Sequence, residues 1–283
     1  MSEPSTKILD HIIHLSPPDT VAQVSEEFKR LGFQVIPGGT HADGLTANAL
    51  VLLQDGVYIE LISFLKPAKD YPPVSDRNKH QWAGKNDGWI DYAFLGSTSA
   101  SIAEIINQRA KDSDTDVAYL PEVHGGRTRS DGETLKWAIT APEARLGRGS
   151  LPFYCADVTP RKLRVPIDHP PGNTEHPSGA AGIAHVRLLA SPPSLKTLAS
   201  QLSSVIGEQP TVSHGLHVWT LDVPKADTPK PLLILGAPAD EEETKALDNK
   251  GPGIYEVAFW TGKDGKKGDG RTEYGSKIVW RPL

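Results

Sequence analysis

A strand–turn–helix segment occurs twice in this chain, about 175 residues apart. The two copies span residues 10–32 and 184–207, and each has a Ser-Pro-Pro turn at the same distance before its closing glycine. Each opening strand carries a matching histidine, His11 in the first copy and His185 in the second. Repetition of this kind predicts a fold assembled from like modules. The matching histidines raise the question of a shared metal site.

Composition favours a soluble globular protein with one large or two modest domains, because 283 residues are 38% hydrophobic and 23% charged. The formal net charge is −5 and no block of Lys and Arg is present, which argues against a nucleic-acid partner. No apolar run approaches the roughly 20 residues that span a bilayer, so we expect no membrane partner.

The ends and the cysteine content indicate where such a protein resides. The first residues contain no hydrophobic stretch, so we expect no secretory signal. Cys155 is the single cysteine and cannot form an internal disulfide, which is typical of a reducing compartment. We therefore expect a cytoplasmic protein.

The first module, residues 8–64, is predicted as β-α-β-β-β. We expect a short strand over 33–36 and then a turn at Pro37-Gly38-Gly39. Two further strands, 48–54 and 57–64, are joined by an Asp-Gly pair that is typical of hairpins.

Three further modules follow, and the economical arrangement pairs the four two and two. The second module has an expected strand over 117–120, and the last has an expected loop over 263–271. This organisation predicts an α+β fold whose tandem βαβββ modules form curved mixed sheets. The expected boundaries are a first domain at 8–158 (modules 8–64 and 89–157), a Pro/Gly-rich connecting loop at 159–181, and a second domain at 182–283 (modules 182–236 and 253–283).

Paired βαβββ units resemble the vicinal oxygen chelate superfamily, which includes glyoxalase I, extradiol dioxygenases, and fosfomycin- and bleomycin-resistance proteins. Three segments of the first module carry the resemblance. They are Leu9-Asp10-His11-Ile12, Leu31-Gly32-Phe33 and Tyr58-Ile59-Glu60-Leu61-Ile62. In that superfamily the last of these strands often supplies a metal-binding Glu or Gln.

A narrower resemblance is to the glyoxalase-like branch. Its segments here are Gly38-Gly39-Thr40-His41, Asn48-Ala49-Leu50, Asp131-Gly132, Leu135-Lys136-Trp137, Leu151-Pro152-Phe153 and His176-Pro177-Ser178-Gly179-Ala180. The superfamily spans lyases, isomerases, oxygenases, transferases and non-catalytic binders, so the resemblance alone does not select an activity.

His11 and Glu60 are the leading candidate metal ligands. In the resembled superfamily both positions point into the concave face of one curved sheet. Alternation along the strand places His11 on one face with Leu9 and Ile13. A glutamate inside an apolar strand is costly to bury unless a cation or a donor neutralises it. Imidazole with carboxylate suits Zn²⁺, Mn²⁺, Ni²⁺ or Fe²⁺.

The remaining ligands depend on which modules pair. If the first module pairs with the third, His185 completes a His-His-Glu set. If it pairs with the second, Asp91 stands near the position equivalent to His11 and Tyr154 near that of Glu60. Glu256, which matches His185 in the last module, is a further candidate that we do not favour.

Other side chains are candidates for contact with a small molecule. His41 follows the Gly-Gly turn and is a candidate proton carrier, because an unperturbed imidazole titrates near pH 6.5. Asn48, Trp137, Phe153 and His176 are candidate substrate-binding residues. Neither a P-loop nor a dinucleotide fingerprint is present, so we expect no nucleotide cofactor.

Two functions of different class fit these features. The first is metal-dependent lyase or isomerase-type chemistry, or dioxygenase chemistry, on a small oxygen-bearing substrate. The second is non-catalytic binding or sequestration of a small organic molecule, as in bleomycin resistance. Because one chain supplies paired modules, either a monomer or a homodimer is expected.

Overall fold

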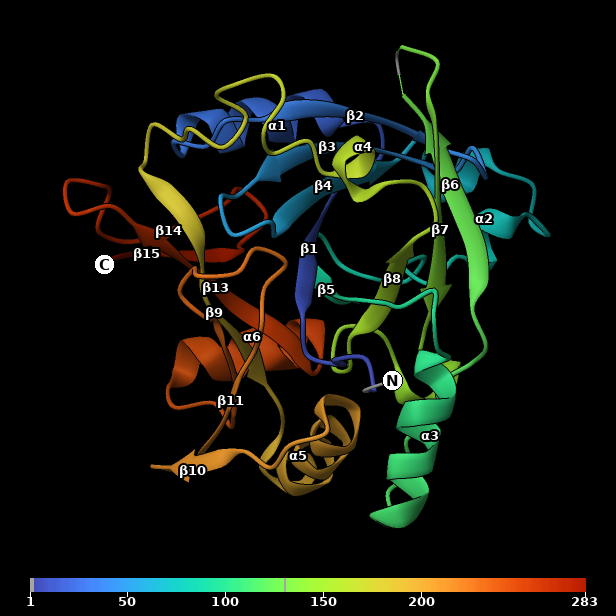
Figure 1. Ribbon diagram of the computed structural model, residues 1–283, viewed down its shortest axis with the longest axis vertical. Coiled ribbons are helices and arrows are strands. Elements are labelled where there is room, and N and C mark those ends of the chain that lie inside the picture. Colours follow the sequence, from blue (N-terminus) through green and yellow to red (C-terminus); the bar gives the residue numbers. More distant parts are fainter. Residues whose placement is uncertain (1–2, 130) are drawn as a thin grey trace.

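The computed structural model describes residues 3–129 and 131–283 as two curved β-sheets with helices around them (Figure 1). The part that precedes residue 165 contains these elements in chain order: β1 (Leu9–Ser16), α1 (Val21–Arg30), β2 (Ile36–His41), β3 (Thr46–Leu52), β4 (Tyr58–Phe64), η1 (Ala68–Asp70), α2 (Asp76–Lys79), β5 (Gly88–Leu95), α3 (Ile102–Asp112), β6 (Val123–Thr128), β7 (Thr134–Thr140), η2 (Ala144–Leu146), β8 (Phe153–Asp157) and α4 (Arg161–Arg164).

The first two modules close into one barrel with the strand order β1-β4-β3-β2-β6-β7-β8-β5. Within it β1 runs parallel to β4 and antiparallel to β5. The modules meet at two seams, β1 with β5 and β2 with β6, and the short antiparallel pairing of β2 with β6 sets His41 opposite Arg127. Directly opposed residues in an antiparallel pair project from the same face, so this seam brings these two side chains together.

The third and fourth modules form a second sheet. Its elements and those beside it are β9 (Ala180–Leu189), α5 (Pro192–Ile206), β10 (Thr211–Ser213), β11 (Leu216–Thr220), β12 (Leu232–Gly236), α6 (Glu241–Lys250), β13 (Gly253–Thr261), β14 (Gly268–Arg271) and β15 (Lys277–Pro282). The seven strands are ordered β10-β11-β12-β9-β13-β15-β14, so this sheet stays open where the first closes.

The two sheets repeat one another at the centre, where the opening strands of paired modules meet antiparallel. The equivalent partners are His11 with Ala93 and Ile13 with Asp91 in the barrel, and His185 with Ala258 and Arg187 with Glu256 in the open sheet. The duplication therefore extends to strand register. The predicted α+β class with curved mixed sheets is confirmed.

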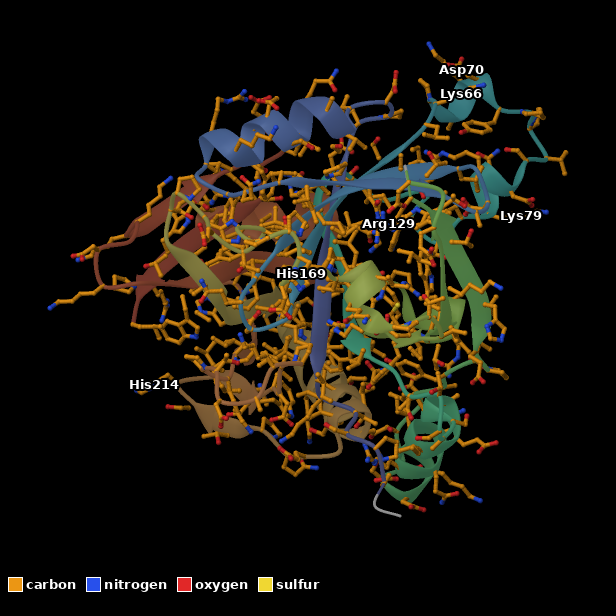
Figure 2. The ribbon with its side chains drawn as sticks, turned by 45° about the horizontal axis from the view of Figure 1, so that its top comes forward. Lys66, Asp70, Lys79, Arg129, His169 and His214 are labelled. Atoms are coloured by element: carbon orange, nitrogen blue, oxygen red, sulfur yellow. The ribbon has the colours of Figure 1, made fainter. Side chains whose placement is uncertain are left out.

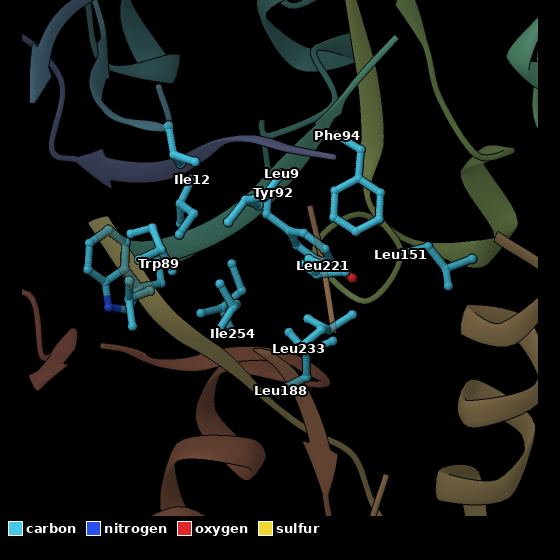
Figure 3. Close-up of a cluster of buried hydrophobic side chains, with 14 of the residues drawn as sticks. Leu9, Ile12, Trp89, Tyr92, Phe94, Leu151, Leu188, Leu221, Leu233 and Ile254 are labelled. Carbon is cyan, nitrogen blue, oxygen red and sulfur yellow. The ribbon is translucent and has the colours of Figure 1, made fainter. Parts of the chain in front are cut away.

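A large apolar core fills the space between the barrel and the open sheet. Figure 3 shows Leu9, Ile12, Tyr92 and Phe94 from barrel strands facing Leu188, Leu221, Leu233 and Ile254 from the other half. Helices α3 and α5, one from each half, also pack together. Burial of this interface supplies the main force that joins the halves.

Four expectations about local structure are wrong. The strand expected over 33–36 is displaced, since β2 begins only at Ile36. The expected turn Pro37-Gly38-Gly39 lies inside β2, which pairs with β3 and β6. The segment 117–120 forms only an isolated bridge, while the second module's strand lies at β6. The expected loop 263–271 contains β14.

The face shared by His11 also differs from the expectation. A register irregularity between Leu9 and His11 turns Leu9 into the core between the sheets. Ile13 does face the barrel interior with His11. The irregularity in register therefore falls at Asp10, directly before His11.

The segment between the first two modules carries η1 and α2, and Figure 2 shows its Lys66, Asp70 and Lys79 at the periphery.

Among the described residues, no helix combines the length and the apolar character needed to cross a membrane.

Candidate functional site

A cavity of about 450 Å³ lies inside the barrel. Its lining comes largely from strands β1, β2, β3, β4, β6, β7 and β8 and from residues 42–43, 80–82 and 120–121 between strands. Among the predicted site residues it contains His11, His41, Asn48, Glu60, Trp137 and Phe153.

His11 is held on both sides of its ring. Its Nδ1 lies 2.7 Å from Asp10 Oδ2, and its ring stacks on Tyr58 with 4.6 Å between centroids. Because Asp10 also binds two arginines as a carboxylate, His11 Nδ1 carries the proton and donates it to Asp10. The other ring nitrogen, Nε2, stands 4.0 Å from Glu60 Oε2.

Glu60 is the centre of a polar group contributed by three strands. Asn48 on β3 donates a hydrogen bond of 2.6 Å to Glu60 Oε1. His41 on β2 places Nε2 3.6 Å from the same oxygen and Nδ1 2.7 Å from Thr46 Oγ1. Burial lowers the pKa of His41 and the nearby Glu60 carboxylate opposes that shift, so the ring is neutral at pH 7.

Asp10 anchors this group to helix α4. Its carboxylate is fully buried and accepts hydrogen bonds from Arg161 and from Arg164, the latter at 2.9 Å. Burial alone would raise the pKa of Asp10, but Arg164 and Arg161 outweigh it and hold that pKa well below its usual range. Arg164 also donates to Tyr58 Oη at 2.8 Å. The charge on Asp10 fixes the orientation of His11.

Asp91, the acid that the second module contributes, is already paired. Asp91 Oδ2 accepts from Trp82 Nε1 at 2.8 Å and from Arg148 Nε at 2.7 Å. Arg148 lies 4.4 Å above the ring of Phe153. Burial raises the pKa of the Cys155 thiol to about 12, so this cavity-lining thiol stays protonated and is a poor nucleophile.

Two predicted site residues lie elsewhere. His176 accepts from Gln34 N at 2.8 Å and donates to Leu52 O at 2.9 Å, so both ring nitrogens bind backbone outside the cavity. His185 belongs to the open sheet, where its Nε2 contacts Glu256 Oε1 at 2.6 Å. The first module pairs with the second, and His185 does not join His11 and Glu60.

Sequence reasoning missed the arginines of the site. Arg127 and Arg164 both line the cavity and are buried. Arg164 lies in the segment interpreted as a linker, and Arg127 lies on a Gly-containing strand that local patterns do not predict. The one usable signal is the cluster of Arg161, Arg164 and Asp157 at helical spacing.

The donors that could hold a cation are His11, His41 and Glu60. Within residues 3–129 and 131–283, no three His, Cys, Asp or Glu side chains already stand at ligand spacing. Donors around one tetrahedral ion with bonds of about 2.1 Å lie about 3.4 Å apart. The 3.6 Å between His41 and Glu60 is close to this value, and the 4.0 Å between His11 and Glu60 exceeds it. The chemistry of the donor set, two imidazoles and a carboxylate, suits a divalent cation.

Comparisons with known proteins bear on the fold. A hypothetical protein from Staphylococcus aureus is similar over 97% of this chain and 99% of its own, with a TM-score of 0.67 and 13% identity. A mutant of 4-hydroxymandelate synthase from Streptomyces coelicolor is similar over 92% of this chain and 72% of its own, with a TM-score of 0.51 and 15% identity. A search of the curated proteins finds no match.

The family comparison covers most of the chain, since the glyoxalase-like domain matches residues 9–206. That range contains the whole barrel and continues through β9 and α5. Together with the structural neighbours, it confirms the resemblance drawn from the strand motifs. The chain is a member of the glyoxalase-like domain family and has the vicinal oxygen chelate fold.

Proposed function

We propose that the barrel cavity is the active site of a metal-dependent enzyme that carries out lyase or isomerase-type chemistry on a small oxygen-bearing molecule. His11, His41 and Glu60 would hold one divalent cation. Imidazole and carboxylate donors of this kind suit Zn²⁺, Mn²⁺, Ni²⁺ or Fe²⁺ and leave coordination positions open for substrate.

The observation that carries the proposal is the orientation of two imidazoles toward one carboxylate. His11 Nε2 and His41 Nε2 face different oxygens of Glu60, at 4.0 and 3.6 Å. On the far side of each ring, Nδ1 lies 2.7 Å from an oxygen of Asp10 or Thr46. Such outer partners are typical of metal-binding histidines, because they fix the tautomer and the ring plane.

When bound, the cation would polarise a substrate oxygen and stabilise negative charge that develops on it. The protein supplies the rest of the site. Tyr58 stays protonated because burial raises its pKa well above the ordinary value, against the opposing charge of Arg164. Trp137 and Phe153 line the cavity and exclude water, which strengthens the electrostatic interactions inside it.

Metal titration of the chelator-treated protein, followed by calorimetry, tests the proposal. We expect about one equivalent of metal per chain, with binding lost in His11→Ala and Glu60→Gln. Thr46→Val removes the hydrogen-bond partner of His41 Nδ1 but none of the atoms that would bind the metal. Loss of such a partner lowers metal affinity about 10- to 100-fold. His214→Asn is the matched control, since His214 is an exposed loop residue at φ 50°, a value that Asn tolerates.

Failure of the wild-type protein to bind any of the four metals would overturn the proposal. If His41→Ala kept its metal but lost turnover, His41 would be the proton carrier that the sequence predicts and not a metal ligand. Equal affinity in wild type and His11→Ala would exclude the barrel as the metal site.

A second function, sequestration of a small molecule without metal, is favoured by one observation. Glu60 Oε1 already accepts a hydrogen bond of 2.6 Å from Asn48, so part of its charge is compensated within the protein. Asp91, the acid contributed by the second module, is likewise occupied by Arg148 and Trp82. Tight binding of small organic molecules by metal-free protein would support this function.

A further inference from the structure

Arg127 is a buried cation without a partner. Its side chain is 4% exposed and lines the cavity. Its Nη1 is buried and, among the described residues, has no hydrogen-bond partner. A guanidinium keeps its charge at neutral pH, and burying it unpaired is strongly unfavourable.

The other arginines of the cavity are neutralised by the protein. Arg164 binds Asp10 and Asp157, and Arg148 binds Asp91. Burial lowers the pKa of Arg127, and the opposing effects of Tyr58 and Glu60 do not outweigh it. Glu60 is itself committed to Asn48 and, in the proposed function, to a cation. Arg127 therefore remains the one uncompensated guanidinium among the described cavity residues.

Its position directs the charge into the cavity. Arg127 stands on β6 opposite His41 on β2, at the seam that closes the barrel. Side chains opposed in this way share a face, so the guanidinium lies beside the candidate metal donors. The planar fork of Arg suits a carboxylate, which it binds through two parallel hydrogen bonds.

The surroundings of Arg127 also carry unpaired positive charge. Arg127 lines a second hollow of about 1090 Å³, together with the segment 161–170. Arg161 and Arg164 in this hollow are paired with Asp10 and Asp157, and Arg129 is paired with Asp131. Lys162 and Lys225 remain, against Asp168; Figure 2 labels Arg129 and His169. An excess of positive charge beside the cavity attracts ligands of the opposite charge.

We infer that the substrate carries a carboxylate that pairs with Arg127, while its apolar body lies against Trp137 and Phe153. This inference rests on the proposed function in taking the barrel cavity as the substrate site. A carboxylate is favoured over a phosphate because a single free guanidinium is available, whereas phosphate sites gather several donors.

The probes are 3-phenylpropanoate and its amide, which match in shape and differ in charge. Calorimetry or ligand-observed NMR on chelator-treated protein should show the acid binding at least tenfold tighter than the amide, as expected for a charge-assisted pair. In Arg127→Gln the affinity for the acid should fall to that for the amide, and Arg127→Lys should be intermediate. Arg129→Gln is the matched control, since Arg129 lies on the same hollow but outside the cavity.

Folding provides an independent readout. Loss of an unpaired buried charge should leave the thermal midpoint of Arg127→Met at or above that of wild type, whereas removal of a structural arginine would lower it. Equal affinity for acid and amide, an unchanged difference in Arg127→Gln, or no binding of either probe at millimolar concentration would overturn the inference. Because metal is absent from these titrations, a protein that binds no metal yet discriminates acid from amide would refute the proposed function and leave this inference standing.

Discussion

The barrel and the open sheet carry equivalent polar residues in equivalent register, yet the two halves use them differently. In the open sheet His185 Nε2 contacts Glu256 Oε1 at 2.6 Å, and Lys277 binds the other oxygen at 3.0 Å. In the barrel His11 Nε2 is free of such a contact and faces a cavity. The same module pair thus produces a self-neutralised cluster in one half and available donors in the other.

The difference follows from the acid on the second opening strand. Asp91 in the barrel is the register equivalent of Glu256 but is one methylene shorter, and Arg148 and Trp82 hold it away from His11. Closure of the barrel by β2 and β6 then adds His41 and Arg127, which have no counterpart in the open sheet. Duplication supplies the scaffold, and the site depends on closure.

The largest effect is expected in the arginine network that distinguishes the barrel. Arg164 is 3% exposed and pairs with Asp10 and Asp157. Its replacement in Arg164→Met takes one guanidinium from the fully buried Asp10, which keeps only Arg161 and His11, and should lower the free energy of unfolding by about 3–5 kcal/mol. Urea denaturation measures the change. Lys162→Met, an exposed position in the same helix, should stay within about 0.5 kcal/mol; equal loss in both variants would contradict the network's role.

A smaller effect is expected from Glu256→Gln in the open sheet. Burial raises the pKa of Glu256, but the hydrogen bonds from His185 and Lys277 outweigh it and hold that pKa at about 2. The stabilisation is present above the unfolded pKa near 4.5 and is lost as the pH falls toward 2. Glu256→Gln should cost about 2–3 kcal/mol at pH 7.

The same variant sharpens the comparison of the halves. The difference in unfolding free energy between Glu256→Gln and wild type should shrink steadily from pH 5 to pH 2. Ligand or metal binding in the barrel should be unchanged, since Glu256 lies outside the cavity. A pH-independent difference would show that the His185 cluster is not ionic.

The smallest effect is expected at Asp55, which joins the two halves. Its carboxylate accepts from Ile183 N at 2.8 Å and from Val57 N at 2.9 Å, and burial raises its pKa to about 6 despite these bonds. A raised pKa means that stability present below pH 3.8 is lost as the pH rises to about 6. Asp55→Asn should therefore flatten the decline of the unfolding free energy over that range, because the amide does not titrate. An identical pH profile in both proteins would contradict the assignment.

Local patterns predict the modules and one face of the site. Alternation along the fourth strand places Tyr58 and Glu60 together, and both line the cavity. His11 is identified instead by its repetition as His185, since the register irregularity after Leu9 breaks the alternation there. The pairing of Tyr58 with Glu60 depends on period-2 geometry within one strand, which a single sequence displays.

Features that depend on long-range pairing are not predictable in this way. Gly38 is predicted in a turn but lies within β2. The position needs glycine because a Cβ there would collide with Asn48 Oδ1. Whether His185 can bind the same metal as His11 depends on which modules pair, and strand periodicity does not determine that pairing. Arg127 enters the site only through the β2–β6 seam between modules.

The attachment of His11 to α4 has a consequence for dissecting the molecule. Arg161 and Arg164 belong to the stretch after β8 that resembles a spacer, yet both bind Asp10, the residue that orients the imidazole. A truncated fragment ending at 158 would leave that carboxylate without either counterion. Any minimal version of the barrel must therefore extend at least through Arg164.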